Sequence, residues 1–266
     1  MRGVLRCGII GPMSADLPDP PRPLVILKLG DTLPELRERQ DDFEHWIARG
    51  LGRNDLDLAV LDPRRGDTLP PPERTAGVVA SGSHAMVSHR EAWSEAAGRW
   101  LAQAAHAGVP VLGICYGHQL LADALGGRAD DHPLGREVGT VEVELLPEAE
   151  GDALMAGLPP RFAAQVVHRQ SALALPPGAV ALARNAWEPH QAVRFGEAAW
   201  GVQFHPEFDD DAMRGYVDAL AGELGEDAAP RRAAVRPTPE AAGLLARFAA
   251  LVARREAARA AGTEPA

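Results

Sequence analysis

Two short segments of this 266-residue chain carry residue types that perform nucleophilic chemistry. In "GICYG", Cys115 stands between Gly113 and Gly117, where an apolar run ends and a helical pattern begins. This is the thiol counterpart of G-x-S-x-G, a sharp strand-to-helix turn that exposes a nucleophile. The sulfur would lie at the carboxyl edge of a sheet, where the helix N-terminus favours its thiolate form. For this segment alone, a buried cysteine acting as a small hydrophobe is the alternative.

The second segment is "WGVQFHPEF", in which His205 and Glu207 stand two residues apart after an apolar strand pattern. A thiolate nucleophile needs an imidazole partner, and the imidazole needs a carboxylate that sets its tautomer and orientation. Pro206 restricts the backbone between the two side chains. A His-x-Glu pair by itself is typical of a protein surface. Together with the Cys115 turn, it predicts a Cys-His-Glu triad.

The elements that must position these residues alternate between strand and helix patterns in the first half of the chain. The apolar runs that predict strands are at 23–30, 55–62, 74–83 and 109–114. Between them, the clearest helical patterns are at 33–52 and 90–110. This alternation predicts a mainly parallel sheet with helices on both faces. In the second half, period-two runs with tight turns predict some antiparallel strands, at 136–146, 162–176, 179–186, 190–196 and 198–208.

The pattern along the chain predicts one α/β domain over residues 24–220. Residues 1–23 are expected to be a disordered leader, because a short apolar segment is followed by proline-rich sequence. Residues 221–237 are expected to be a loop, and residues 238–260 a helix that packs on the domain. The apolar stripe of that helix consists of Leu244, Leu245, Phe248 and Leu251.

Composition excludes several classes of partner. The net charge of −10 and the lack of a dense basic run argue against nucleic acid. No apolar stretch reaches the roughly 18 to 20 residues of a membrane-spanning helix. Cys7 and Cys115 are too few for a disulfide framework, which favours a reducing cytoplasm. No histidine spacing resembles a metal site such as H-E-x-x-H. The chemistry of a Cys-His-Glu triad needs neither a metal nor an organic cofactor, so none is expected.

"GICYGHQLLADALGG" together with "GVQFHPEF" resembles the class I glutamine amidotransferase family, over about residues 24–220. The resemblance is to a stand-alone protein like the glutaminase domain of GMP synthase, and it implies a flavodoxin-like α/β fold. It implies that Cys115 is the nucleophile, that His205 is the base and acid, and that Glu207 orients His205.

The resemblance also implies an oxyanion hole made of backbone N–H groups. One donor would be Tyr116, and the other would come from the turn that contains Gly82 and Ser83. This turn departs from the Ser-Gly-Gly-Pro of GMP synthase-like members, because it reads Ser-Gly-Ser-His. A backbone donor tolerates a changed side chain if the dihedral angles are kept. Which N–H of the turn points inward is left open.

Further residues are assigned to the substrate pocket by the same resemblance. Gln119 is expected to hold the amino acid end of the substrate, and His168 lies in a region whose backbone contacts the substrate in the family. His118 stands where many relatives have methionine and is interpreted as a packing or rim residue. The mouth of the pocket is expected near Ser83, His84 and His118.

The expected reaction is the hydrolysis of L-glutamine to glutamate and ammonia through a γ-glutamyl thioester. No phosphate-cradling loop follows Glu207, so the ammonia would pass to a synthetase on a separate chain. The first alternative is a γ-glutamyl peptidase or hydrolase acting on γ-glutamyl compounds. The second is a non-catalytic binding protein on the same fold, which the complete set of Cys115, His205 and Glu207 disfavours.

Overall fold

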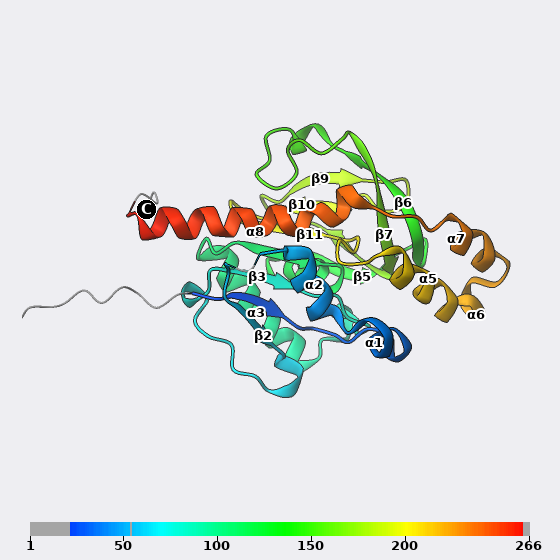
Figure 1. The fold of residues 1–266 in the computed structure, drawn as a ribbon, viewed down its shortest axis with the longest axis horizontal. Helices are drawn as coiled ribbons and strands as arrows, with labels where there is room; N and C mark the ends of the chain where they lie inside the picture. Colours follow the sequence, from blue (N-terminus) through cyan, green and yellow to red (C-terminus); the bar gives the residue numbers. More distant parts are fainter. Residues whose placement is uncertain (1–21, 54, 263–266) are drawn as a thin grey trace, which may run out of the picture.

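A mixed sheet lies between two helical layers in the computed structural model, which describes residues 22–53 and 55–262 (Figure 1). In this part of the chain the sheet has nine strands, in the order β2-β1-β3-β4-β11-β10-β9-β6-β7. The first five are parallel, and the others pair antiparallel. The parallel strands are β1 (Leu24–Leu27), β2 (Leu58–Leu61), β3 (Gly77–Ala80), β4 (Val111–Ile114) and β11 (Ala199–Val202).

The antiparallel part of the sheet comes from the second half of the chain, as the period-two pattern predicts. Its strands are β6 (Glu137–Leu145), β7 (Arg161–His168), β9 (Val180–Arg184) and β10 (Ala192–Arg194). A separate two-stranded antiparallel sheet is formed by β5 (Arg128–Asp131) and β8 (Gln170–Ala174). The predicted α/β fold, mainly parallel with some antiparallel strands, is therefore confirmed.

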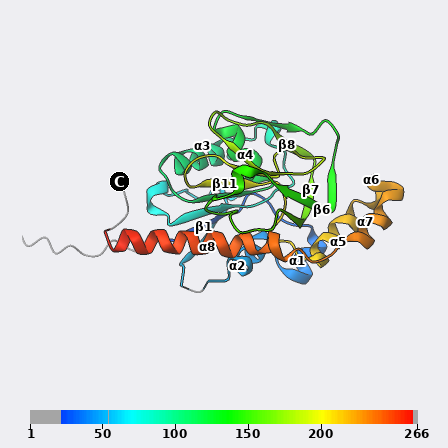
Figure 2. The same ribbon diagram turned by 90° about the horizontal axis from the view of Figure 1, so that it is seen from above.

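Helices cover both faces of the parallel strands (Figure 2). On one face lie α2 (Phe43–Leu51) and α8 (Pro239–Ala260), and on the other lie α3 (Ala92–His106) and α4 (Tyr116–Ala124). Alternate residues of β1 explain the two cores: Leu24 and Ile26 pack toward α2 and α8, whereas Val25 and Leu27 pack toward α3 and α4. A strand buried on both faces reads as a continuous apolar run, which is what residues 23–30 show.

The helical pattern of residues 33–52 forms two helices rather than one. α1 (Pro34–Gln40) ends before Asp41, which has a positive φ of 70°, and Asp42 then caps α2. The carboxylate of Asp42 accepts from the backbone N–H groups of Phe43 and Thr32 and contacts Lys28. These tertiary contacts hold Asp42 outside a helix, although its local spacing fits one.

Residues 221–237, which were expected to be a loop, are largely helical. After α5 (Asp210–Ala219) the chain forms α6 (Ala221–Leu224) and α7 (Ala228–Ala234). Pro230 lies in the first turn of α7, where its missing N–H costs no helical hydrogen bond. Arg231 donates to the carbonyl of Val138, and Arg232 bonds Asp218. Long-range contacts therefore outweigh the Gly, Pro and charge content that predicted a loop.

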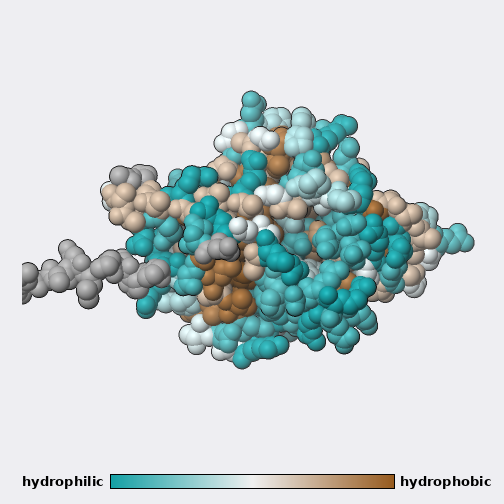
Figure 3. Space-filling model, viewed as in Figure 1, coloured by the Kyte–Doolittle hydropathy of each residue, from teal (hydrophilic) through white to brown (hydrophobic). Residues whose placement is uncertain are grey.

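Most of the molecular face in Figure 3 is hydrophilic. A hydrophobic patch in its lower left lies over β2, the edge strand, where Val60 is 47% exposed. In the described part of the chain, no helix has the length and apolar character needed to cross a bilayer.

Candidate active site

Cys115 occupies a sharp turn between β4 and α4. Its φ of 48° is positive, a conformation that costs a non-glycine residue about 1–3 kcal/mol. A Cβ atom added at Gly113 would lie 2.6 Å from the carbonyl carbon of Gly117, and one added at Gly117 would lie 2.5 Å from the oxygen of Ala80. The turn packs this tightly on itself and on β3, so both positions require glycine. The local geometry predicted from G-x-C-x-G is present.

His205 and Glu207 lie at the end of β11 and contact each other directly. The distance from His205 Nδ1 to Glu207 Oε1 is 2.8 Å, and both side chains are buried. The backbone N–H of His205 donates to the carbonyl of Gln165 in β7, and the ring of Phe208 stacks on the imidazole at 4.1 Å. His205 Nε2 has no hydrogen-bond partner among the described residues. The imidazole is thus oriented at one nitrogen and available at the other.

The turn after β3 brings the cysteine and the histidine together. A Cβ added at Gly82 would lie 3.1 Å from His205 Cε1 and 4.0 Å from Cys115 Cβ. The turn is anchored from below, because Ser81 Oγ accepts from the N–H of Leu29 and donates to the carbonyl of Gly82. The Gly82 backbone therefore lies against both Cys115 and His205, where an oxyanion donor is needed.

Ser83 and Tyr116 are the other predicted oxyanion residues, and both line the same cavity. A Cβ at Gly30 would lie 2.5 Å from Ser83 Cα, so the loop after β1 holds this turn in place. Tyr116 is the first residue of α4, and the first N–H groups of a helix have no partner within the helix. The positions of these backbone groups agree with the predicted roles, which stay predictions.

The charges around His205 favour its protonated form. Burial disfavours the imidazolium, but the negative charges of Glu207 and Cys115 outweigh burial and raise the pKa of His205 to about 10. The arrangement is therefore suited to hold an imidazolium between the Glu207 carboxylate and the Cys115 sulfur. Such a pair supplies a nucleophile and a proton donor to one substrate.

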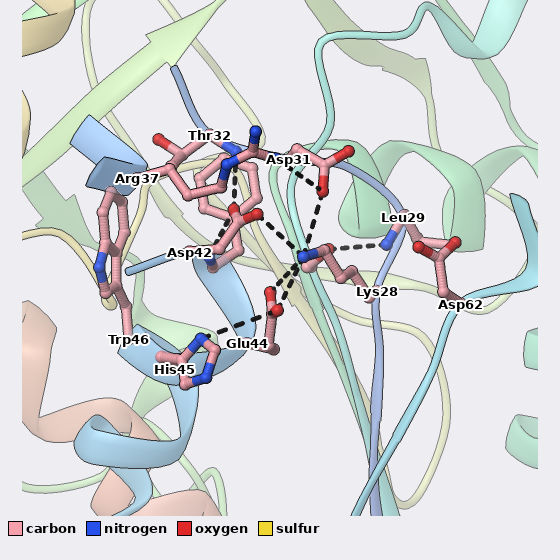
Figure 4. A network of polar contacts seen from close by, with 12 residues as sticks. Lys28, Leu29, Asp31, Thr32, Arg37, Asp42, Glu44, His45, Trp46 and Asp62 are labelled. Carbon is pink, nitrogen blue, oxygen red and sulfur yellow. Dashed lines mark hydrogen bonds and ion pairs between the residues drawn. The ribbon is translucent and has the colours of Figure 1, made fainter. Parts of the chain in front are cut away.

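The single lysine of the chain supports the loop beside this site (Figure 4). Lys28 Nζ lies 2.9 Å from Asp42, 2.7 Å from Glu44 and 3.1 Å from Asp31, and its side chain is only 9% exposed. A compact ammonium can meet three converging carboxylates, whereas the planar guanidinium of arginine is a rigid fork. The cluster fixes the segment that carries Gly30 toward the Ser83 turn.

Two hydroxyl groups connect this loop to the cavity. Thr32 Oγ1 lies 3.0 Å from the hydroxyl of Tyr216, which lies 3.1 Å from His84 Nε2. Tyr216 and His84 line the cavity. Tyr216 also stacks on Phe208, which itself stacks on His205. The α5 helix and the loop after β1 therefore support the imidazole from one side.

A cavity of about 260 Å³ opens beside the cysteine. It contains most of the residues predicted for the pocket, together with residues of α5 and of the turn before β6. The lining is formed by Leu33, Phe43, Ser83, His84, Ala85, Met86, Cys115, Tyr116, Gln119, Arg136, Val167, His168, Arg169, Gln170, His205, Tyr216, Ala219 and Leu220. The Ser83 turn, the Cys115 turn and His205, which are far apart in the sequence, therefore meet at one cavity.

Gln119 and His168 are held by hydrogen bonds within the protein. Gln119 Nε2 donates to the carbonyl of Gln170 and to Gln203 Oε1, at 2.7 and 3.0 Å. The His168 ring bonds Glu137 at 2.9 Å and the carbonyl of Gln170 at 3.0 Å, and its side chain is fully buried. Both residues line the cavity, but the His168 ring is already engaged. Its predicted contact with substrate would therefore involve its backbone.

His118 does not lie at the mouth of the cavity, and this expectation was wrong. The residue is fully buried, and it packs on Phe195 and above Gly201, where an added Cβ would lie 2.3 Å from its Nδ1. It follows Cys115 by three residues on α4, a spacing that turns it toward the sheet. Burial lowers the pKa of His118 to about 3, with smaller contributions from His190 and His168. It is a neutral packing residue.

Replacing His118 is expected to stabilise the protein. Neither ring nitrogen has a hydrogen-bond partner among the described residues, so a neutral imidazole leaves its N–H unpaired. His118→Met should raise the free energy of unfolding by about 1 kcal/mol, because an apolar side chain has no such group. Urea unfolding of both proteins measures the difference. A destabilised variant would mean that the buried ring has a hydrogen-bond partner after all.

Sequence reasoning missed Arg136, Phe43 and Tyr216, which all line the cavity. They come from the turn before β6, from α2 and from α5, and none belongs to a local motif. The sequence contained one hint that the loop after β1 is important. Lys28 is the single lysine of the chain, and the other 26 of its 27 lysine and arginine residues are arginine. Arg136 offers no comparable signal in the sequence.

Comparison with known proteins indicates the family of this chain. The family model described as "Glutamine amidotransferase class-I" matches residues 36–216. The chain is 42% identical over 170 residues to a glutamine-hydrolyzing GMP synthase of Aeropyrum pernix, covering 62% of this chain and 31% of that protein. It is 33% identical over 196 residues to one subunit of a glutamine-hydrolyzing GMP synthase of Methanopyrus kandleri, covering 70% of this chain and 97% of that polypeptide. The match thus spans about a third of the first relative and nearly all of the second.

Solved structures share the fold. A glutamine amido transferase from Methylobacillus flagellatus superposes with a TM-score of 0.67 at 24% identity, covering 88% of this chain and 94% of that chain. A glutamine amidotransferase from Thermotoga maritima gives a TM-score of 0.65 at 21% identity, and the superposition covers 86% of this chain and 97% of that chain. At these identities the likeness concerns the fold alone.

Proposed function

Because this chain belongs to the class I glutamine amidotransferase family, we propose that it hydrolyses the γ-amide of L-glutamine through Cys115, His205 and Glu207. The observation that carries the proposal is the site itself. An imidazole that is bound to a carboxylate at 2.8 Å faces the same cavity as a cysteine on a strained turn. A triad of this kind supports acyl transfer.

The proposed reaction has two steps. The Cys115 thiolate attacks the amide carbon, backbone N–H groups of Tyr116 and of the Gly82–Ser83 turn bind the oxyanion, and His205 donates a proton to departing ammonia. His205 then takes a proton from water, which attacks the γ-glutamyl thioester and releases glutamate and the thiolate. Glu207 stabilises the imidazolium in both steps.

The proposed recipient of the ammonia is a synthetase on a separate chain. The Methanopyrus relative is named as one subunit of a GMP synthase, and the chain covers 97% of it. Relatives from Pyrococcus abyssi and Thermococcus kodakarensis are named in the same way, and 62% of each is covered. These names support a division of the enzyme between chains, and the acceptor is part of the proposal.

A γ-glutamyl hydrolase is the second candidate, and the size of the cavity is compatible with it. Its volume of about 260 Å³ lies just below the roughly 300 Å³ of the smallest pockets that hold drug-sized ligands. A leaving group larger than ammonia could therefore be accommodated. The same three side chains would cleave a γ-glutamyl peptide by the same two steps.

The two candidates are separated by kcat/KM for glutamine and for γ-glutamyl dipeptides, measured with and without cell extract. We expect slow glutamine hydrolysis by the protein alone and a strong increase with extract, because a synthetase-dependent glutaminase is activated by its partner. Extract supplemented with Cys115→Ala protein corrects for glutaminases already present. A dipeptide preference of about tenfold, roughly 1.4 kcal/mol, without stimulation would favour the hydrolase.

A further inference from the structure

The charged side chains that line the cavity are basic. Its lining contains two arginines, Arg136 and Arg169, and among the described residues no Asp or Glu contributes to it. The chain as a whole has a net charge of −10. Each arginine pairs with a carboxylate outside the lining, Arg136 with Glu223 and Arg169 with Asp131, so an anionic ligand would use the guanidinium N–H groups that these pairs leave free. Glutamine carries one anionic group, its α-carboxylate.

Arg136 presents unused donors to this cavity. Its Nε donates to Glu223 Oε1 of α6 at 2.9 Å, and its side chain is 21% exposed. Within the described part of the chain, neither terminal nitrogen has a recorded hydrogen-bond partner. Burial, then the positive charges of His205 and Arg136, lower the pKa of His84, which lines the same cavity. The guanidinium is therefore held at one edge while its two terminal nitrogens can bind a carboxylate.

The backbone of Arg136 is fixed by the next residue. The Glu137 carboxylate accepts from His168 Nε2 at 2.9 Å, from Asn185 Nδ2 at 2.7 Å and from Gln191 Nε2 at 3.1 Å. This buried network anchors the start of β6. By contrast, the Arg169 side chain is 54% exposed and bonds Asp131 through both Nε and Nη2. Of the two arginines, Arg136 is less exposed to solvent and uses fewer of its N–H donors in bonds within the protein.

We propose that Arg136 binds the α-carboxylate of the substrate and that the site recognises this acid group more strongly than the α-amino group. The inference rests on the proposed glutamine hydrolysis. Neutral groups such as the side chain of Gln170 are the acceptors that the lining offers to an ammonium. Glutaramate, which lacks the α-amino group, is therefore a substrate, and it is hydrolysed with one water to glutarate and ammonia.

Three amides test the proposal: glutamine, glutaramate, and 4-aminobutanamide, which lacks the α-carboxylate. For the wild-type protein, kcat/KM for glutaramate should lie within about tenfold of glutamine, and that for 4-aminobutanamide at least about 30-fold lower, as expected when a charge-assisted bond is lost. A larger loss for glutaramate than for 4-aminobutanamide would overturn the inference.

The second part of the test replaces Arg136. Arg136→Met should raise KM for glutamine about 30-fold with little change in kcat, and should leave 4-aminobutanamide hydrolysis unchanged. Arg136→Lys should restore part of the affinity, which a general effect on folding would not do. Arg128→Met is the matched control, because Arg128 is 62% exposed, pairs with Asp130 and does not line the cavity.

The outcomes separate this inference from the proposed function. If Arg136→Met weakens glutamine and 4-aminobutanamide equally, or if Arg169→Met shows the selective loss instead, the role of Arg136 is refuted while glutamine hydrolysis stands. If the wild-type protein releases no ammonia from glutamine, even with extract, and the glutamine mimic diazo-oxo-norleucine does not modify Cys115, the proposed function itself fails.

Discussion

Cys115→Ala is expected to lower the turnover of glutamine by at least about 10⁴-fold while the fold is retained. The substitution removes the proposed nucleophile and only one heavy atom from a residue that is 5% exposed. Alanine and cysteine meet the same backbone strain at φ 48°, so the turn itself is little affected. Ammonia release measures turnover, and circular dichroism with thermal unfolding measures the fold.

Cys7→Ala is the control for this experiment, because Cys7 is the other cysteine of the chain and lies outside the described residues. It is expected to retain wild-type turnover. Mass spectrometry after treatment with diazo-oxo-norleucine should place the modification on the peptide that contains Cys115. A folded Cys115→Ala protein with near-wild-type activity would eliminate the thiol mechanism.

The second large effect concerns the imidazole and its carboxylate. His205→Asn should reduce kcat/KM by about 10⁴-fold, and Glu207→Gln by about 10²-fold, because acid–base catalysis is lost in the first and weakened in the second. In the wild-type protein the Glu207 carboxylate lies 2.8 Å from His205 Nδ1; the amide introduced by Glu207→Gln can still accept a hydrogen bond from the ring but carries no charge. The order of severity, measured as kcat/KM at one pH, is the test.

The pH profile gives Glu207→Gln a signature of its own. Negative charge on Glu207 and Cys115 raises the pKa of His205 to about 10, so the wild-type imidazolium persists up to about that pH. Loss of one negative charge lowers this pKa, and the basic limb of the kcat/KM profile should move to lower pH. An unchanged basic limb would contradict the assigned role of Glu207.

Asp209→Asn is the matched control for the carboxylate. Asp209 lies two residues beyond Glu207, and its Oδ1 accepts from the N–H of Ala212 to cap α5. Asparagine caps a helix about as well as aspartate, so kcat/KM and its pH profile should remain those of the wild type. A loss as large as that of Glu207→Gln would point to Asp209 as the orienting group.

Cys115, His205 and Glu207 could be predicted from the sequence because each lies in a short local motif. Gly113 and Gly117 are required by close contacts within a single turn, and that turn sets the backbone of Cys115. Likewise, His205 and Glu207 are two residues apart, so one turn at the end of β11 brings them into contact. Chemistry that depends on neighbouring residues leaves a short, readable pattern.

Other features were decided by residues far apart in the chain. Lys28 holds Asp42, which breaks the helical pattern of residues 33–52. Long-range bonds make residues 221–234 largely helical, although their composition predicts a loop. These contacts outweigh local helix preferences, which amount to less than about 1 kcal/mol for most residues.

The sequence by itself determined the α/β class and the Cys115 turn with its His-Pro-Glu partner, since strand periodicity and short-range sterics act between neighbouring residues. Only the tertiary structure decided that His118 is buried under Phe195, and that Arg136 faces the cavity with Glu223 at its side. Arg136 and Glu223 are separated by 87 positions. No local sequence pattern predicts the contact between Arg136 and Glu223, because it depends on how the sheet and the helices that follow it pack together.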